Sequence, residues 1–129
     1  MITEYKLVSF FDSFPGGLNT LVGEEGLNLS GGQKQIIAFV RAIFRSPDFL
    51  LVDEGTSNMD TGTEKIIINL INSLKSKMGI LMISHKVNLI KKISDSIYIL
   101  DSGTISGSGI HEDLINGNNL YKRFWDDFY

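Results

Sequence analysis

The fold of this chain is decided by Leu29-Ser30-Gly31-Gly32-Gln33 and by Phe49-Leu50-Leu51-Val52-Asp53-Glu54, which begins twenty residues later. A serine and two glycines at the start of a helix can bind an anion, because the first N–H groups point outward, the helix dipole favours negative charge and no Cβ blocks the approach. Four apolar residues then bring two adjacent carboxylates to the end of a predicted strand, where they suit Mg²⁺ and an attacking water. The pairing indicates phosphate binding next to metal-assisted phosphoryl chemistry.

The composition is typical of a small globular protein. The chain has 129 residues, of which 43% are hydrophobic and 21% charged, enough for one domain with a core and too few for two. Its net charge of −3 does not indicate a general nucleic-acid surface. It has no cysteine, which fits a reducing compartment and excludes disulfides and thiolate metal sites. No apolar run approaches the ~20 residues that span a bilayer, and no signal-peptide pattern is present. We therefore expect a soluble, cytoplasmic chain that could dock onto a membrane partner.

Local signals place a helix directly after the first stretch. An amphipathic helix is predicted within residues 1–14, and residues 18–29 are predicted to form an irregular connector. Ser30 is a good N-cap, and Gln33 follows at the spacing of a capping box. The helix that they open is predicted to extend to about Arg45.

The rest of the chain alternates between strands and helices. Residues 49–52 and 80–83 are continuous apolar runs, as in strands that are covered on both faces. Asp60 or Thr61 is predicted to cap a helix that Gly79 closes. Three shorter helices and a tight hairpin are predicted after the second strand, the helices at 87–93, near 111–115 and near 120–128, the hairpin around residues 102–103. This order predicts an α/β class with a mostly parallel sheet, flanking helices and a C-terminal β-hairpin.

Three polar residues follow the two predicted strands. Asp53 and Glu54 come after the first strand, and His85 comes after the second. Because the carboxyl ends of parallel strands meet at one edge of a sheet, we expect these three side chains to converge there.

Taken together, the motifs resemble the C-terminal part of an ATP-binding-cassette (ABC) transporter ATPase domain. Residues 29–33 are similar to the ABC signature, residues 49–54 to the Walker B strand with its following glutamate, and residues 57–60 to the D-loop. His85 stands where the H-loop histidine belongs. The resemblance covers nearly the whole chain. The sequences of the motifs are most similar to those of exporters, including peptide and bacteriocin exporters. It implies a partial P-loop ATPase fold, with residues 1–46 in the helical signature subdomain and residues 47–129 in the catalytic core.

The resemblance also implies roles for these residues. Asp53 would hold Mg²⁺, and Glu54 would orient or deprotonate the attacking water. His85 would hydrogen-bond the γ-phosphate of ATP and keep Glu54 in position. The residues that would contact the ATP of the opposite protomer or join the two protomers are Ser30, Gly31, Gly32, Gln33 and Asp60.

The partners that the resemblance implies follow from these roles. A second ABC ATPase domain would form a head-to-tail dimer with this one, so that half of each catalytic site comes from the other protomer. A transmembrane transporter domain would hold the pair at the cytoplasmic side of the membrane. No nucleic-acid partner is expected.

The sequence departs from the family pattern in one large respect. No Gly-x-x-x-x-Gly-Lys-Ser/Thr loop, which cradles the β- and γ-phosphates in the family, occurs in the 129 residues. We therefore expect the chain by itself to bind ATP poorly and to hydrolyse little or none. Its uncovered strand edges would favour self-association. A milder departure is Gly55, which stands where alanine is common.

Two other functional interpretations stay open at this point. The chromosome-structure and DNA-repair ATPases share a signature helix and a Walker B glutamate, and a non-catalytic fragment could supply only the signature face to a partner.

Two local features also have a second interpretation. His111 beside Glu112 and Asp113 could indicate a metal cluster, but a position at a helix start is favoured. The aromatic residues around Trp125 could form a docking patch, but packing of a terminal helix is favoured.

Overall fold

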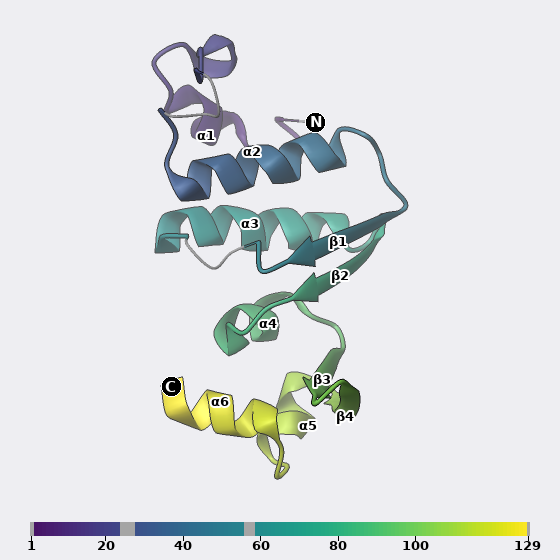
Figure 1. Ribbon diagram of the computed structural model, residues 1–129. Helices are drawn as coiled ribbons and strands as arrows, with labels where there is room; N and C mark the ends of the chain where they lie inside the picture. The colour runs from purple at the N-terminus through teal and green to yellow at the C-terminus, as the bar shows by residue number, and fades with distance from the viewer. Residues whose placement is uncertain (1, 24–27, 56–58, 129) are drawn as a thin grey trace. The chain divides into compact units, whose positions relative to one another are not determined.

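The computed structural model describes residues 2–23, 28–55 and 59–128 (Figure 1). The chain forms two compact units, Met1–Ile83 and Ser84–Tyr129, and each is described by itself. Both units combine helices with a two-stranded sheet, which gives the α/β class that the sequence predicts. None of the helices in these described ranges is both long and apolar enough to cross a bilayer.

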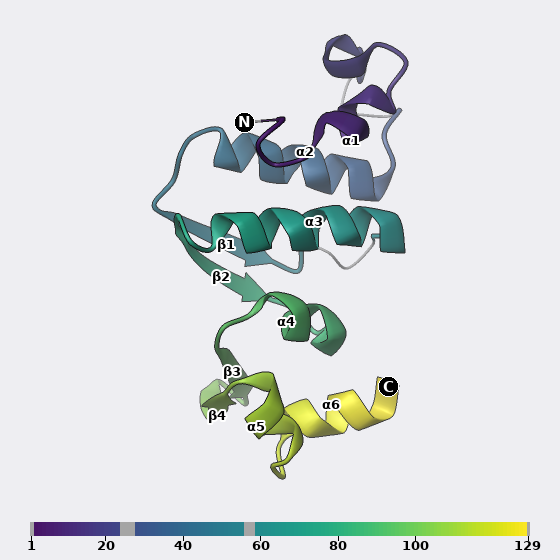
Figure 2. The ribbon, with the colours of Figure 1, turned by 180° about the vertical axis from the view of Figure 1, so that it is seen from behind.

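Two helices form the framework of the first unit. α2 (Gly31–Ile43) and α3 (Thr61–Leu74) lie alongside one another in the same direction, next to the strands β1 (Phe49–Asp53) and β2 (Gly79–Ile83) (Figures 1 and 2). On α3 the apolar side chains at helical spacing are buried as predicted, namely Ile67, Leu70, Ile71 and Leu74. On α2 the predicted Ile36, Val40 and Ile43 are buried and Phe39 joins them, whereas the predicted Ile37 is half-buried and the predicted Phe44, the C-cap residue, is 52% exposed. Both caps are also confirmed, Ser30 for α2 and Asp60 for α3.

The strands of the first unit are parallel, with Phe49 opposite Gly79 and Asp53 opposite Ile83. The prediction that they are covered on both faces is wrong for the described residues. Leu50 and Val52 are buried, whereas the alternate residues Phe49, Leu51, Leu81 and Ile83 are about half exposed or more. The helices pack on one face of the sheet, and successive strand side chains point to opposite faces, so the other apolar face stays open.

Two helix bounds in the first unit differ from the sequence prediction. The predicted N-terminal helix is short, since only α1 (Val8–Asp12) is helical, followed by the 3-10 turn η1 (Gly17–Asn19). Its anchors are Leu7 and Phe10, which are buried. In addition, α3 stops at Leu74 rather than near Gly79. The N–H groups of Lys77 and Met78 turn back to the Leu74 carbonyl, and Gly79 then begins β2.

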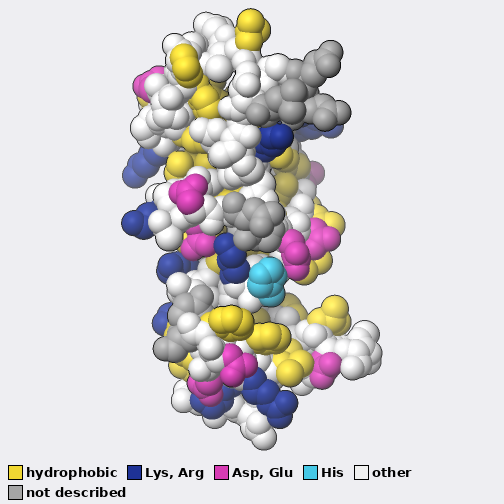
Figure 3. Space-filling view, turned by 60° about the vertical axis from the view of Figure 1, so that its left-hand side comes forward, with side chains coloured by type: hydrophobic (Ala, Val, Ile, Leu, Met, Phe, Trp, Pro, Cys, Tyr) yellow, Lys and Arg dark blue, Asp and Glu magenta, His cyan; other side chains and the backbone are white. Residues whose placement is uncertain are grey.

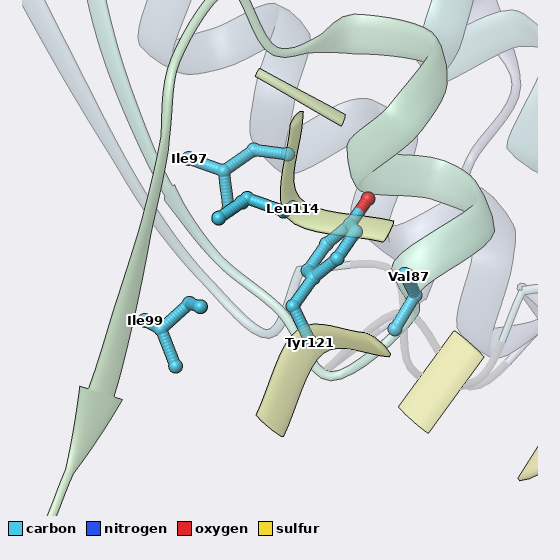
Figure 4. Packing of buried hydrophobic residues seen from close by; sticks show 5 residues of the cluster. All are labelled: Val87, Ile97, Ile99, Leu114 and Tyr121. Carbon is cyan, nitrogen blue, oxygen red and sulfur yellow. The ribbon is translucent and has the colours of Figure 1, made fainter. Parts of the chain in front are cut away.

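The second unit contains α4 (Val87–Ile93), the antiparallel strands β3 (Ile97–Asp101) and β4 (Thr104–Gly109), α5 (His111–Ile115) and α6 (Leu120–Phe128). The predicted hairpin is confirmed, and its turn residues Ser102 and Gly103 have positive φ angles of 50° and 79°, as a tight two-residue turn requires. The core of this unit is shown in Figure 4 and consists of Val87, Ile97, Ile99, Leu114 and Tyr121.

Candidate functional site

The start of α2 is built by a reciprocal pair of hydrogen bonds. The Ser30 Oγ accepts from the Gln33 N–H at 3.2 Å, and the Ser30 N–H donates to the Gln33 Oε1 at 2.9 Å. This capping box fixes the turn that leads into the helix. The first N–H groups of a helix have no acceptor within the helix, so that of Gly31 can bind a ligand. Gly31 is exposed, and a Cβ placed on it would meet no atom within 4 Å. An anion can therefore approach the backbone there directly.

Gly32 faces the other way, towards α3. It is buried, and a Cβ placed on it would lie 2.9 Å from the Thr63 Cγ2 and 3.2 Å from the Thr63 Oγ1. Such contacts are too close for a real Cβ, so Gly32 is required by packing. The start of α2 therefore has one glycine open to an approaching group and one glycine pressed against the neighbouring helix.

The start of α3 lies beside it and is held by Asp60. The Asp60 Oδ1 accepts from the N–H groups of Gly62 at 2.8 Å and Thr63 at 3.0 Å, and the Oδ2 accepts from the Thr63 hydroxyl at 2.7 Å. The hydrogen bond from the Thr63 hydroxyl, followed by that from the Thr63 N–H, holds the pKa of the exposed Asp60 carboxyl below its usual value. Of the other residues of the predicted D-loop, Ser57 and Asn58 lie outside the described residues.

Asp53 and Glu54 stand where β1 ends, as the sequence predicts. Asp53 is the last strand residue, and the Glu54 N–H donates to the Ile83 carbonyl at 2.9 Å, extending the ladder with β2 by one bond. Both carboxylate residues are exposed. Glu54 has a φ of 46°, an unusual backbone conformation for a residue with a side chain. The chain therefore turns sharply at the residue for which a catalytic role was predicted.

An open groove lies between α2 and β1. It has a volume of about 220 Å³ and is lined by Gln35, Ala38, Phe39, Ala42, Leu50, Leu51, Val52, Asp53 and Gly55. The Gln35 Oε1 is buried and has no hydrogen-bond partner among the described residues. A buried carbonyl oxygen without a donor is uncommon in folded proteins. Gly55 is closely packed, because a Cβ at this position would lie 2.8 Å from the Val52 Cγ1.

His85 belongs to the second unit, so its predicted convergence with Asp53 and Glu54 stays a prediction. It is exposed and lies in the short connection before α4. Next to it, the Ser84 Oγ accepts from the Lys86 N–H at 3.1 Å. On the face that Figure 3 shows, acidic and basic side chains are interspersed with apolar ones.

The second histidine, His111, stands at the start of α5, the position favoured over a metal site. It is buried, its Nδ1 is hydrogen-bonded to the Tyr121 hydroxyl at 2.9 Å, and its ring meets the Trp125 ring edge-on with centroids 4.7 Å apart. Burial lowers the pKa of His111, and the positive charge of Lys91 lowers it further. In the described part of the chain, no group of three His, Asp or Glu side chains is arranged to hold a metal ion.

The donor set at the end of β1 nevertheless fits Mg²⁺. This ion usually keeps several waters and takes one or two protein carboxylates together with phosphate oxygens. The exposed Asp53 carboxylate supplies one such oxygen ligand. The open backbone at Gly31 separately suits a phosphate group.

Thr63 was not among the predicted site residues, although it contacts both Asp60 and Gly32. The sequence carries a weak signal for it, because the third residue after an aspartate N-cap is a common hydrogen-bond partner of that cap. Its contact with Gly32 depends on how two helices pack and has no local signal.

Comparisons with known proteins agree with the predicted motifs. Residues 8–57 match the protein family described as ABC transporter. The chain is 40% identical over 113 residues to the mitochondrial potassium channel ATP-binding subunit of Xenopus tropicalis and 39% identical over 119 residues to an ATM1-type heavy metal exporter of Novosphingobium aromaticivorans. These alignments cover 88% and 92% of the chain but 16% and 19% of the relatives. The chain thus spans less than a fifth of the length of either relative.

A solved structure is similar in both fold and sequence. It is described as a bacterial Atm1-family ABC exporter with ATP bound, and it matches with a TM-score of 0.81 and 33% identity. The match covers 98% of this chain and 22% of that one. The two compact units therefore correspond to part of an exporter's ATPase domain, with its partial P-loop ATPase fold.

Proposed function

The chain belongs to the ABC transporter ATPase family, as a segment of an exporter-type ATP-binding domain, and we propose that the complete domain binds and hydrolyses ATP to drive export through a transmembrane partner. One observation carries the proposal. A single compact unit contains both a capped helix start with an exposed glycine and, at the end of a strand, two consecutive residues with carboxylate side chains. The first arrangement suits a phosphate group, and the second suits Mg²⁺ and an attacking water.

Three side chains act on the reacting groups in this proposal. Asp53 holds the magnesium ion, which would neutralise charge that develops on the transferring phosphoryl group. Glu54 orients the attacking water and accepts its proton, and its exposure at the end of β1 leaves it accessible to a nucleotide. His85 hydrogen-bonds the γ-phosphate and keeps Glu54 in position.

The signature helix start serves the partner protomer. Ser30, Gly31, Gly32 and Gln33 form the turn that receives the γ-phosphate of a nucleotide bound by a second ABC ATPase domain, in a head-to-tail dimer. In this turn Gly31 is open to the phosphate, and Gly32 holds the helix start against α3. The open approach to Gly31 supports this role, because the space around it has no neighbouring side chain to displace. Asp60 joins the two protomers. We further propose that residues 1–46 belong to the helical subdomain and residues 47–129 to the catalytic core, held at the cytoplasmic side of the membrane by the transporter domain.

The 129-residue chain is proposed to be inactive when isolated. It contains no Gly-x-x-x-x-Gly-Lys-Ser/Thr loop, and the contacts of such a loop to a transferring phosphoryl group are each worth several kcal/mol. Purified chain should therefore release no phosphate from Mg²⁺–ATP above background. Turnover at the rate of an intact ABC ATPase would contradict this.

A segment exchange tests the proposed activity directly. The chain replaces the aligned segment of the Atm1-family exporter, which shares its fold, and ATP hydrolysis by the chimera is measured in membranes or detergent. We expect hydrolysis that falls about 10²–10⁴-fold on Glu54→Gln, because a positioned general base is lost. Glu112→Gln, which makes the same chemical change at an exposed position of α5, is the matched control and should keep the rate.

Two outcomes of this experiment would overturn the proposal. One is a chimera that hydrolyses ATP equally well with Glu54→Gln. The other is a folded chimera without ATPase activity whose binding partner is DNA, with an affinity that falls steeply as salt rises, since this would favour the DNA-repair class.

A further inference from the structure

We propose that Thr63 is a positioning residue that joins Asp60 to Gly32, so that a change at the Asp60 carboxylate alters the first turn of α2. We call the contacts Asp60–Thr63 and Thr63–Gly32 together the joint. Its purpose rests on the proposed function, in which Asp60 contacts the partner protomer and the start of α2 contacts the nucleotide of that protomer. The joint would couple these two contacts. The joint itself is a feature of the folded chain.

The Asp60 side of the joint consists of two hydrogen bonds from one residue. Thr63 donates its N–H to the Asp60 Oδ1 at 3.0 Å and its hydroxyl to the Asp60 Oδ2 at 2.7 Å. The two carboxylate oxygens are therefore engaged by the backbone and the side chain of the same threonine. This fixes the Thr63 side chain in one rotamer, because rotation about its χ1 would break the bond to Oδ2.

The Gly32 side of the joint is a close packing contact. The Thr63 methyl group would lie 2.9 Å from a Cβ on Gly32 and so occupies the place that a side chain at residue 32 would take. Gly32 is buried at this point. The first turn of α2 therefore rests on a methyl group whose direction is set by the hydrogen bond to Asp60.

Threonine combines the two groups that the joint needs on one Cβ. Serine would keep the hydroxyl and lose the methyl group, and valine would keep the branched shape and lose the hydroxyl. Valine therefore removes the hydroxyl bond to the Asp60 Oδ2 and keeps the backbone N–H bond to the Oδ1, and serine removes the methyl contact with Gly32 and keeps both hydrogen bonds. Thr61 lies two residues away in the first turn of the same helix, is exposed, and provides a matched control.

The test is a double-substitution cycle read by NMR on the isotopically labelled full chain at neutral pH, without nucleotide. Asp60→Asn removes the charge and one acceptor oxygen. We expect it to shift the backbone amide resonances of Gly32 and Gln33 in the wild-type background. The shift should be smaller when Thr63→Val or Thr63→Ser is already present. In the Thr61→Val background the shift should be retained.

The outcomes separate a joint from a field effect. If Asp60→Asn shifts the Gly32 and Gln33 resonances equally in the Thr63→Val and Thr63→Ser backgrounds, the influence passes through space or by another route, and the proposal is overturned. Far-UV circular dichroism checks that each variant is folded. If Thr63→Val does not fold, Thr63→Ser alone decides, because it retains the hydrogen bond and lacks only the methyl contact.

A second measurement separates this proposal from the proposed function. In the chimera, Thr63→Val should lower kcat for ATP hydrolysis with little change in KM, whereas Thr61→Val should change neither. If the chimera hydrolyses ATP but the NMR coupling is absent, the role of Thr63 is overturned and the proposed function is not. NMR coupling in a chain whose chimera is inactive leaves the joint in place and counts against the proposed function.

Discussion

Gly31 and Gly32 are neighbours in the sequence with opposite surroundings. Gly31 faces open space, and Gly32 is buried against the Thr63 side chain. The sequence motif alone does not distinguish the two. In the structure Gly31 leaves open space at the start of the helix, and Gly32 packs against the neighbouring helix.

This difference leads to a paired prediction about stability. Gly32→Ala should lower the free energy of unfolding by about 1–3 kcal/mol, because the new methyl group overlaps with Thr63 and forces α2 and α3 apart. Gly31→Ala should leave stability unchanged or raise it by up to about 0.5–1 kcal/mol, because alanine reduces the entropy of the unfolded chain and meets no neighbour. Urea denaturation of both variants checks this. Equal effects would contradict the packing role of Gly32.

At the scale of the elements, the helices are held by caps and by apolar periodicity, which are local. The capping box at Ser30 and Gln33, the cap at Asp60 and the apolar positions of α3 could all be predicted from short windows of sequence. The bounds of α4, α5 and α6 could be predicted in the same way. These signals are strong because the interacting groups lie within one or two helical turns.

The burial of the strands could not be predicted in this way. A continuous apolar run gives the position of a strand, but what covers each face depends on elements that are distant in the sequence. Leu51 and Leu81 therefore lie on an open face although the sequence suggests a buried strand. Asp53, Glu54 and His85 could be predicted as candidate site residues because each directly follows an apolar run in the sequence. The Thr63–Gly32 contact could not be predicted, because it depends on how two helices pack.

The pair α5 and α6 leads to a prediction about pH. The pKa of His111 is lowered in the folded chain, first by burial and then by Lys91, while the unfolded chain keeps the ordinary value of 6.5. Below that value the unfolded chain binds the proton more readily, so stability is complete above it and falls as pH drops towards the lower folded pKa. The free energy of unfolding should therefore be smaller at about pH 5.5 than at about pH 7.5.

A double variant identifies the source of this pH dependence. His111→Phe with Tyr121→Phe removes both partners of the buried hydrogen bond, so that no polar group is left unpaired. The loss of stability on acidification should become smaller than in the wild-type chain, as measured by thermal unfolding at the two pH values. An unchanged loss would mean that groups other than His111 cause it.

For the molecule as a whole, the dominant feature is the uncovered face of the β1–β2 sheet. Four large apolar side chains are exposed on it, namely Phe49, Leu51, Leu81 and Ile83. The groove beside α2 is open as well, and the Gln35 Oε1 in it has no partner among the described residues. Apolar faces of this kind favour association.

We predict that the purified chain self-associates through this face. Leu51 and Leu81 are opposite one another in the strand register, so Leu51→Lys with Leu81→Lys places two like charges at its centre. This double variant should have a lower mass than wild type by light scattering. Leu21→Lys, at a residue that is 91% exposed outside the sheet, should not. A wild-type chain that runs as a sharp monomer and unfolds cooperatively would contradict the prediction.

The two adjoining helix starts also differ in electrostatic balance. α2 and α3 begin side by side, so the positive ends of their dipoles lie close together. At the N-terminus of α3, the Asp60 carboxylate and Glu64 in the first turn compensate the positive end of the helix dipole. The N-terminus of α2 has a neutral serine cap and no acidic residue in its first turn. An anion that approaches this pair therefore meets an unbalanced positive potential at α2 and a balanced one at α3. For the proposed phosphate contact, the unequal caps therefore favour the open backbone at Gly31 over the start of α3.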